Sequence, residues 1–522
     1  MNFKAHINTV VLFILVVLST SCSLVKKPKI NLLNEVILPK PLSVTASESS
    51  FELNAKTKIF VHEGSEELLN IGHYFANLIK PATGFDLKVK STTTMSNSNS
   101  IYLSISKLEP KFGKEGYILK ISDKKVNISA NSPEGIFHGI QTLRQIFPKE
   151  IEASTKQKQL WFIGTGEIHD YPQYEYRGAM LDVSRHFFNV EDVKKYIDML
   201  VVYKLNMLHL HLSDDQGWRI EIKSWPNLTE HGGSTEVGGG KGGFYTQEEY
   251  KDIIEYAQER YINIIPEIDM PGHTNAALAS YSELNISGKV TQLYTGMKVG
   301  FSTLDTNKKI TYQFIGDVVR ELSEMTPGPY IHIGGDESHV TAMEDYIPFI
   351  NKVQDIVLAN GKQMIGWDEI AHADLKANTI VQFWARLENA QKGVEKKAKV
   401  ILSPANKMYL DMKYDSITKL GLNWAGYVDV ESAYRWTPST LIPGISKSEI
   451  LGIESPLWTE TITNMKELEY MVFPRIIGHA EIGWTLDSLR DWNDYKFRLK
   501  KHLERLKIMG INYYSLDSIS RK

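Results

Sequence analysis

Two adjacent carboxylates, Asp336 and Glu337, follow a short apolar run and two glycines in the sequence I-H-I-G-G-D-E-S, residues 331–338. Neighbouring side chains on a regular strand point to opposite faces, but the glycines allow an irregular backbone that aims both carboxylates at one spot. One carboxylic acid that gives a proton and one carboxylate that stabilises positive charge suit acid-catalysed cleavage of a glycosidic bond. An isolated acidic pair is also typical of an exposed turn, so the other motifs of the chain must decide between a catalytic pair and a turn.

Eight short apolar runs alternate with helical segments in the second part of the chain. The runs are 180–183, 207–212, 262–268, 330–333, 364–367, 380–383, 400–403 and 450–453, and helices fit between them, for example at 190–203, 247–260 and 311–325. This repeated alternation predicts a parallel (β/α)₈ TIM barrel, with a doubly wound open sheet as the alternative.

Polar or aromatic side chains follow each of the eight predicted strands. Active sites of such barrels lie at the carboxyl ends of the strands, so these side chains are predicted to meet in one site. In chain order they are Asp182 and Arg185, Asp214 and Asp215, Asp269 and His273, Asp336 and Glu337, Trp367, Trp384, Tyr409 and Asp411, and Trp458 and Glu460.

The aromatic residues at these strand ends favour a sugar as the ligand. A sugar ring has apolar C–H faces and a polar rim, which indole rings and carboxylates can recognise respectively. Any single tryptophan is more typical of core packing, but three of them, Trp367, Trp384 and Trp458, stand at predicted strand ends.

The pair His209 and His211 supports a rival interpretation. The H-x-H spacing places both imidazoles on one face of a strand, as in metal-dependent barrel hydrolases. Such a metal site would need ligands from other strand ends, where tryptophan and tyrosine stand instead. We therefore expect structural histidines inside the barrel and no metal or other cofactor.

The N-terminus has the pattern of an export signal. Lys4 precedes an apolar run at 10–18, which is too short to span a bilayer, and small residues lead to Cys22, the only cysteine of the 522 residues. Residues 1–22 are similar to a bacterial lipoprotein signal peptide, and an ordinary secretory signal is the alternative. We expect an exported protein of the cell envelope that meets the membrane only through a lipid on Cys22.

Composition agrees with a soluble globular body that has no affinity for nucleic acid. The chain is 42% hydrophobic and 23% charged, and its formal net charge is −3. Residues 23–50 are predicted to be a tether, 51–165 a small α+β accessory domain, and 172–522 the barrel. Within the accessory domain we expect strands at 58–61 and 101–105, a helix at 66–79 that ends near Pro81, a hairpin at 117–130 and a helix at 133–145.

Five ordered motifs resemble the family 20 glycoside hydrolases, the β-N-acetylhexosaminidases. They are R-G-A-M-L-D-V-S-R-H-F-F, H-L-S-D-D-Q-G-W-R, P-E-I-D-M-P-G-H-T, H-I-G-G-D-E and P-L-W-T-E. The resemblance extends from about residue 40 to the C-terminus and includes the accessory domain. It implies an exo-acting, retaining enzyme that removes terminal GlcNAc or GalNAc, in which the substrate's own acetamide oxygen forms an oxazolinium intermediate.

The same resemblance implies roles for individual residues. Asp336 would orient the acetamide, and Glu337 would be the general acid and then the base, with its pKa raised from ~4.3 toward ~6 by its surroundings. His273 and Asp214 would tune Glu337, and Asp269 would support the site. Sugar contacts would come from Arg185, Trp367, Trp384, Tyr409, Asp411, Trp458 and Glu460.

Two alternatives to this enzyme remain at this point. One is a glycan-binding lipoprotein on the same scaffold, and the other is the metal-dependent hydrolase built on His209 and His211. The expected partners are glycans that contain N-acetylhexosamine; the natural glycan and the choice between GlcNAc and GalNAc are left open.

Overall fold

The computed structural model describes residues 27–62, 64–94 and 99–516. The predicted signal peptide and Cys22 lie outside these residues. Within them, no helix combines the length and the apolar character that a membrane crossing requires.

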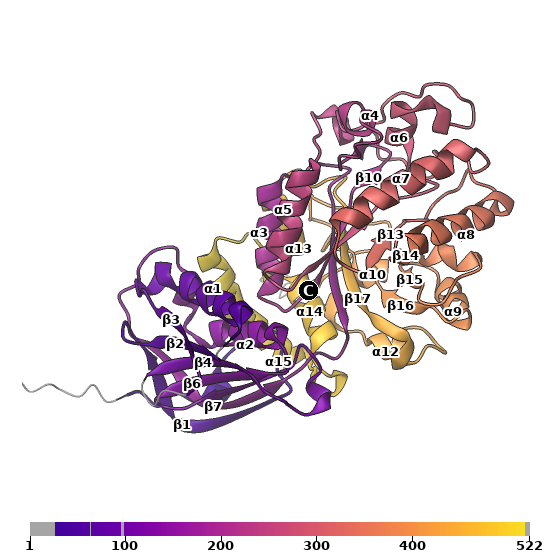
Figure 1. Cartoon of the computed structure of the whole chain (residues 1–522). Helices are drawn as coiled ribbons and strands as arrows, with labels where there is room; N and C mark the ends of the chain where they lie inside the picture. The colour runs from indigo at the N-terminus through magenta and orange to yellow at the C-terminus, as the bar shows by residue number, and fades with distance from the viewer. Residues whose placement is uncertain (1–26, 63, 95–98, 517–522) are drawn as a thin grey trace, which may run out of the picture.

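A closed barrel of eight parallel strands forms the larger part of the molecule (Figure 1), which confirms the predicted fold. Each predicted apolar run lies in one strand, and β17 closes the barrel by pairing with β8. The strands, in barrel order, are β8 (Tyr176–Asp182), β9 (Met207–His211), β12 (Asn263–Glu267), β13 (Tyr330–His332), β14 (Gln363–Trp367), β15 (Ile380–Phe383), β16 (Lys399–Leu402) and β17 (Ile450–Leu457).

Amphipathic helices cover the outside of the barrel. Their starts follow the sequence closely: α5 begins after Thr246, whose hydroxyl and Glu249 form a reciprocal capping box. The connection from β14 to β15 is the 3₁₀ turn η6 (Asp368–His372) rather than an α-helix. The principal barrel helices are α3 (Val190–Val201), α5 (Gln247–Gln258), α7 (Lys309–Met325), α8 (Met343–Ala359), α9 (Leu387–Glu395), α13 (Met465–Val472) and α14 (Arg475–Trp484).

Smaller elements lie in the loops at the two ends of the barrel. The loop after β9 contains a two-stranded ribbon that places Asp214 on its first strand. These elements are β10 (Ser213–Asp214), β11 (Gly217–Trp218), α4 (Asn227–Glu230), α6 (Asn275–Ser280), α10 (Ala405–Met408), α11 (Val430–Tyr434) and α12 (Pro438–Leu441).

The accessory domain is a seven-stranded mixed sheet with two helices, as the predicted α+β class requires. Its strand order is β1-β7-β5-β6-β4-β2-β3. Its elements are β1 (Ser43–Leu53), β2 (Lys58–His62), α1 (Glu66–Thr83), β3 (Lys88–Thr92), β4 (Ser100–Ile105), β5 (Tyr117–Ile121), β6 (Lys125–Ala130), α2 (Pro133–Ile146) and β7 (Trp161–Asp170).

The structure corrects three predictions for this domain. The predicted tether at 23–50 includes the 3₁₀ turn η1 (Leu32–Asn34) and most of β1, because β1 gains its stability from pairing with β7 rather than from its own pattern. Strand β7 continues to Asp170, past residue 165, where the accessory domain was predicted to end. Helix α1 continues past Pro81 to Thr83 and ends at Gly84, whose φ of 70° suits a left-handed cap.

Helix α15 (Trp492–Met509) joins the two domains. Arg505 donates to Glu152 Oε1 and to the Phe147 carbonyl oxygen of the accessory domain, both at 2.7 Å. Arg498 donates to both oxygens of Glu481 on α14, each at 2.7 Å. The helix thereby fixes the accessory domain against the barrel.

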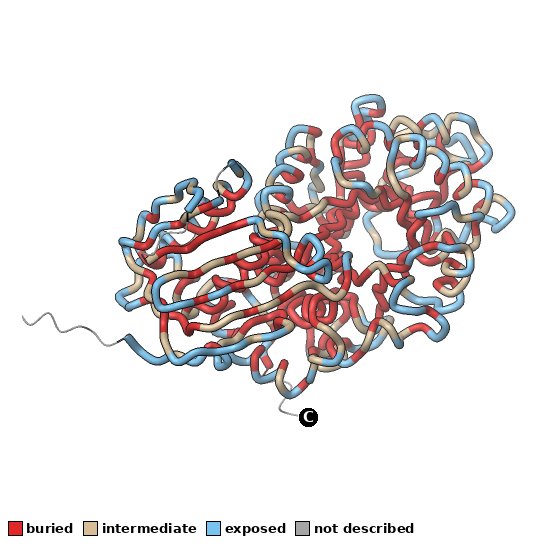
Figure 2. The backbone as a smooth tube through the Cα atoms, turned by 60° about the horizontal axis from the view of Figure 1, so that its bottom comes forward, coloured by how far each residue is buried: buried red, intermediate tan, exposed pale blue. Residues whose placement is uncertain are grey.

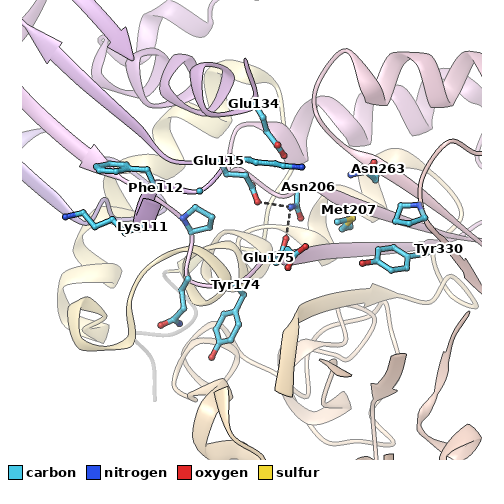
Figure 3. Close-up of a pocket in the computed structure, with 15 residues that line it drawn as sticks. Lys111, Phe112, Glu115, Glu134, Tyr174, Glu175, Asn206, Met207, Asn263 and Tyr330 are labelled. Carbon is cyan, nitrogen blue, oxygen red and sulfur yellow. Dashed lines mark hydrogen bonds between the residues drawn. The ribbon is translucent and has the colours of Figure 1, made fainter. Parts of the chain in front are cut away.

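Buried residues are concentrated in the ring of barrel strands, and along the strands of the accessory sheet they alternate with less buried residues (Figure 2). A cavity of about 560 Å³ lies between the accessory domain and the amino ends of β9, β12 and β13 (Figure 3). There Arg177 pairs with Glu115, and Asn206 donates to the Glu175 carbonyl oxygen at 2.8 Å. Because this end of a TIM barrel serves stability, we assign these contacts to domain packing.

Candidate active site

A cavity of about 350 Å³ opens at the carboxyl end of the barrel strands. Most of its lining was predicted from strand ends, and the rest comes from two long loops. Its lining residues are Arg185, Met297, Val299, Asp336, Glu337, Trp384, Tyr409, Asp411, Leu422, Trp424, Trp458 and Glu460.

The turn after β13 aims Asp336 and Glu337 into this cavity. Gly334 and Gly335 have φ values of 65° and 97°, and Glu337 itself has a φ of 44°. A β-carbon on Gly334 would lie 1.9 Å from Asp269 Oδ1. Positive φ in a residue with a side chain costs energy, so the surrounding contacts must maintain this turn. Two such contacts are the Gly335 N–H bond to Asp269 Oδ1 (3.0 Å) and the Tyr346 hydroxyl bond to the Gly335 carbonyl (2.6 Å).

A second charged group stands directly behind Glu337. His273 Nε2 lies 3.6 Å from Glu337 Oε2, and His273 Nδ1 lies 3.2 Å from Asp214 Oδ1. Arg185 Nη2 is 2.9 Å from the other oxygen of Asp214. Burial acts to raise the pKa of Asp214, but Arg185 and His273 outweigh it and hold that pKa far below its usual range. Asp214 in turn is the main reason that the pKa of the buried His273 is raised.

The predicted upward shift of the Glu337 pKa is wrong. Burial does act to raise this pKa, but the nearby, positively charged His273, with smaller contributions from Arg185 and His339, brings it below the ordinary value. The pKa of Asp336 moves the other way, because burial and the neighbouring Asp269 raise it well above its ordinary value. The two pKa values are therefore shifted in opposite directions, and Asp336 is the more readily protonated member of the pair.

Asp269 lies beneath Asp336 and does not line the cavity. It is 2% exposed, and burial raises its pKa to about 7. The Asp269 Oδ2 and Asp336 Oδ1 atoms are buried without a hydrogen-bond partner among the described residues. Asp336 Oδ1 thus belongs to a residue on the cavity wall and is ready to accept a hydrogen bond from a bound ligand.

Aromatic rings form the walls of the cavity. Trp384 stacks beside Tyr409 with ring centroids 6.5 Å apart, and Trp458 lies 6.3 Å from Tyr409. Trp424 meets Trp384 edge-on at 5.8 Å and is 55% exposed at the mouth. Trp367, which was expected to be a wall, is 1% exposed and packs behind Trp458 at 5.8 Å. Trp367 does not line the cavity, because its indole N–H points inward and donates to Glu267 Oε1.

Polar groups for the rim of a ligand lie opposite these rings. Both carboxylate oxygens of Asp411 are buried and have no partner among the described residues. Burial, with the nearby charge of Glu460, raises the pKa of Asp411, and burial raises that of Glu460. Arg185 Nε also has no partner within the described structure. Together with Asp336 Oδ1, these three atoms make four unpartnered polar atoms on cavity-lining residues, which fit a ligand rich in hydroxyl groups.

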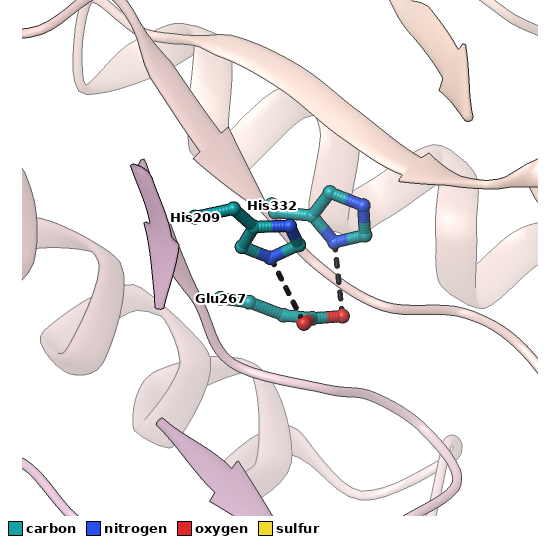
Figure 4. Close-up of side chains that lie close together, drawn as sticks. All are labelled: His209, Glu267 and His332. Atoms are coloured by element: carbon teal, nitrogen blue, oxygen red, sulfur yellow. Dashed lines mark ion pairs between the residues drawn. The ribbon is translucent and has the colours of Figure 1, made fainter. Parts of the chain in front are cut away.

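His209 and His211 point into the barrel, where carboxylates occupy the ring nitrogens that a metal would need. His209 Nε2 and Nδ1 lie 2.9 Å from Glu267 Oε2 and Glu454 Oε1. His332 Nδ1 lies 3.0 Å from the other oxygen of Glu267 (Figure 4). His209, Glu267 and His332 are close enough to share an ion, but both ring nitrogens of His209 and of His211 already face carboxylates. This geometry therefore does not favour the metal-dependent hydrolase.

Sequence reasoning missed the loop residues at the mouth: Met297, Val299, Leu422 and Trp424. A backbone bond from the Asp305 N–H to the Leu284 carbonyl (2.9 Å) closes the loop that carries Met297 and Val299. Trp424 is the one missed residue with a usable signal, since an indole ring can pack on the apolar face of a sugar. Its distance from any predicted strand end hid it.

Comparisons with known proteins agree with this geometry. Residues 174–487 match the model of glycosyl hydrolase family 20, catalytic domain, and residues 34–171 match family 20, domain 2. A Cellulomonas fimi β-N-acetylhexosaminidase is 38% identical over 492 residues, which cover 93% of this chain and 97% of the relative.

Solved structures give the same result. The family 20 β-N-acetylhexosaminidase of Streptomyces coelicolor A3(2) has a TM-score of 0.89 and 46% identity, covering 92% of this chain and 97% of that one. A mutant Streptomyces plicatus β-hexosaminidase in complex with its product GlcNAc has the same TM-score and identity, covering 92% of this chain and 96% of that one. The chain therefore belongs to glycosyl hydrolase family 20, the β-N-acetylhexosaminidases.

Proposed function

We propose that the enzyme removes a terminal, non-reducing GlcNAc or GalNAc residue with retention of configuration through substrate-assisted catalysis. The observation that carries the proposal is the buried Asp336 Oδ1, which has no partner among the described residues and stands one residue from Glu337. A carboxylate in this position suits an acetamide N–H donor. The product GlcNAc bound to the Streptomyces plicatus relative supports the same sugar class here.

In the first step, the acetamide carbonyl oxygen attacks the anomeric carbon and the glycosidic C–O bond breaks. Glu337 gives its proton to the departing oxygen, and Asp336 accepts the acetamide N–H as positive charge develops on the oxazolinium ring. In the second step, water attacks the anomeric carbon, its proton goes to Glu337, and the ring opens to restore the acetamide.

Substrate binding must lower the pKa of Asp336 and raise that of Glu337. The acetamide N–H favours the charged form of Asp336, and the sugar excludes water from Glu337, which favours its neutral form. The cavity of about 350 Å³, closed by Trp384 and Trp458, fits a single terminal sugar and hence exo-action.

The decisive experiment compares Glu337→Gln with Glu344→Gln, a change of the same type at an exposed position of α8. We expect Glu337→Gln to lower kcat on phenyl β-N-acetylglucosaminide by ~100-fold or more, which is the usual contribution of general acid catalysis. The kcat of Glu344→Gln should equal that of the native enzyme. Trifluoroacetamide substrates should slow the native enzyme, because their carbonyl oxygen is a poorer nucleophile. If the native enzyme hydrolysed the trifluoroacetamide substrates as fast as the acetamides, substrate assistance would be contradicted.

We also infer export to the cell envelope with a lipid on Cys22. The support is the order of Lys4, the apolar run at 10–18 and Cys22 in the sequence. Labelled palmitate should enter the native protein and not Cys22→Ala. Equal labelling of both would refute the anchor.

A further inference from the structure

A row of buried charged side chains begins deep inside the barrel. Glu454 Oε1 lies 2.9 Å from His209 Nδ1, and His209 Nε2 lies 2.9 Å from Glu267 Oε2. The same Glu267 oxygen lies 2.5 Å from His211 Nδ1. All four side chains are fully buried.

The row continues without a gap to the cavity. His211 Nε2 lies 2.7 Å from Asp214 Oδ2, and Asp214 Oδ1 lies 3.2 Å from His273 Nδ1. His273 Nε2 then lies 3.6 Å from Glu337 Oε2. Acidic and basic groups alternate at every step from Glu454 to Glu337.

His211 must be positively charged in this arrangement. A neutral imidazole has one N–H, so it could donate to only one of the two carboxylates that face its ring nitrogens. Glu267 and Asp214 both lie within hydrogen-bond distance, and neither can donate when ionised. Burial opposes the charge, but these two carboxylates raise the pKa of His211 well above its ordinary value.

We propose that Glu267 and His211 are positioning residues for hydrolysis: they fix the orientation and charge of Asp214, which in turn holds the His273 imidazolium against Glu337. Neither residue lines the cavity. The inference rests on the proposed role of Glu337 as proton donor, and it extends that site by two residues into the barrel.

Other side chains also contact the residues of this row, and these contacts would remain in a variant of Glu267 or His211. Glu267 Oε1 also faces His332 Nδ1 and accepts from Trp367 Nε1 at 2.9 Å, while Arg185 remains on Asp214. The Trp458 ring meets His211 edge-on at 4.9 Å. Glu454 accepts from Tyr176 and Gln382, and the acidic groups Asp269 and Asp336 lie beyond Glu267.

The change Glu267→Gln removes the negative charge that keeps His211 doubly protonated. The glutamine amide can donate to His211 Nδ1, so a neutral His211 would still donate to Asp214 through Nε2. Asp214 then loses a full positive charge at 2.7 Å while the more distant charge of Glu267 also disappears. The field at His273 becomes more negative, and the His273–Glu337 pair releases its proton at a higher pH.

The test measures kcat/KM, which reports the step in which the leaving group departs, and its pH profile on two β-N-acetylglucosaminides, one with phenol and one with 2,4-dinitrophenol as leaving group. Phenol needs a proton from Glu337 to depart, whereas 2,4-dinitrophenol departs largely without one. The variants are Glu267→Gln and His211→Gln. Glu454→Gln is the matched control, because it removes a buried carboxylate two steps further from Asp214 in the same row.

We expect both variants to lose at least tenfold in kcat/KM on the phenyl substrate and less than threefold on the dinitrophenyl substrate. The basic limb of Glu267→Gln should move to higher pH, and Glu454→Gln should show neither effect. Equal losses on both substrates, or the same pattern in Glu454→Gln, would overturn the inference and leave the row a purely structural role.

Glu337→Gln, measured beside these variants, tests the proposed proton donor separately from the positioning residues Glu267 and His211. If Glu337→Gln discriminates between the leaving groups and the Glu267 and His211 variants do not, the inference alone is wrong. If Glu337→Gln itself does not discriminate, the proposed proton donor is wrong and the inference falls with it. Should Glu267→Gln fail to fold, His211→Gln provides the same comparison.

Discussion

Replacing Gly334 by alanine tests how the acidic turn is aimed. The residue has a φ of 65°, and an added β-carbon would lie 1.9 Å from Asp269 Oδ1 and 2.8 Å from Asp269 Cα. Rotation of the Asp269 side chain cannot relieve a contact with its own backbone. The backbone of the turn after β13 must therefore move away from β12.

The structure gives the size of this effect. Left-handed backbone in alanine costs ~1–2 kcal/mol. Displacement of Asp269 also weakens the charge-assisted bond from the Gly335 N–H, which contributes ~1.5–3 kcal/mol. We expect a total loss of ~3–5 kcal/mol in the free energy of unfolding. A shift of ~1 Å in Asp336 and Glu337 should lower kcat by ~100-fold.

The matched control is Gly361→Ala. Gly361 has a φ of 73° with nothing within 4 Å of the added β-carbon, so this variant carries the backbone strain without the clash. Urea unfolding should place it ~1–2 kcal/mol below the native protein, with native kcat. If Gly334→Ala were as stable as Gly361→Ala and retained full turnover, our account of the turn would be refuted.

Three further changes test other contacts. Tyr346→Phe removes the hydroxyl bond to the Gly335 carbonyl, so kcat should fall with a stability loss of only ~1 kcal/mol; steady-state kinetics and urea unfolding measure both. Arg498→Met leaves Glu481 buried without its charge partner, so unfolding stability should drop by ~3–5 kcal/mol at unchanged kcat. Burial opposes the charge of His209, but its two carboxylates raise its pKa to about 9. That stabilisation is complete below pH ~6.5 and is lost as pH rises through 9, so urea midpoints should fall over this range in the native protein and less in His209→Gln.

The barrel could be predicted because its strands are buried on both faces and read as continuous apolar runs. Strands β1 and β7 could not, since their outer faces are polar and their pairing joins segments more than a hundred residues apart. Helix α1 continues through Pro81 because tertiary packing of its apolar face outweighs the local penalty of proline.

The site was predictable where a residue stands at a strand end, as Asp336, Glu337 and Arg185 do. The orientation of a side chain was not predictable. Trp367 is the last residue of β14, but its indole N–H points inward to Glu267. The direction of the Glu337 pKa shift also required coordinates, because burial and the charge of His273 act in opposite directions. The distance between the His273 and Glu337 side chains decides which of these two effects on the Glu337 pKa is larger.

The joining role of α15 has a consequence for biosynthesis. The ribosome releases the accessory domain and the barrel strands before it releases Trp492–Met509. Until then the Phe147 carbonyl and Glu152 have no Arg505 to meet, and contacts such as the Arg177–Glu115 pair alone hold the two domains together. A chain truncated before this helix would therefore leave the Phe147–Glu152 part of the interdomain seam exposed to proteases.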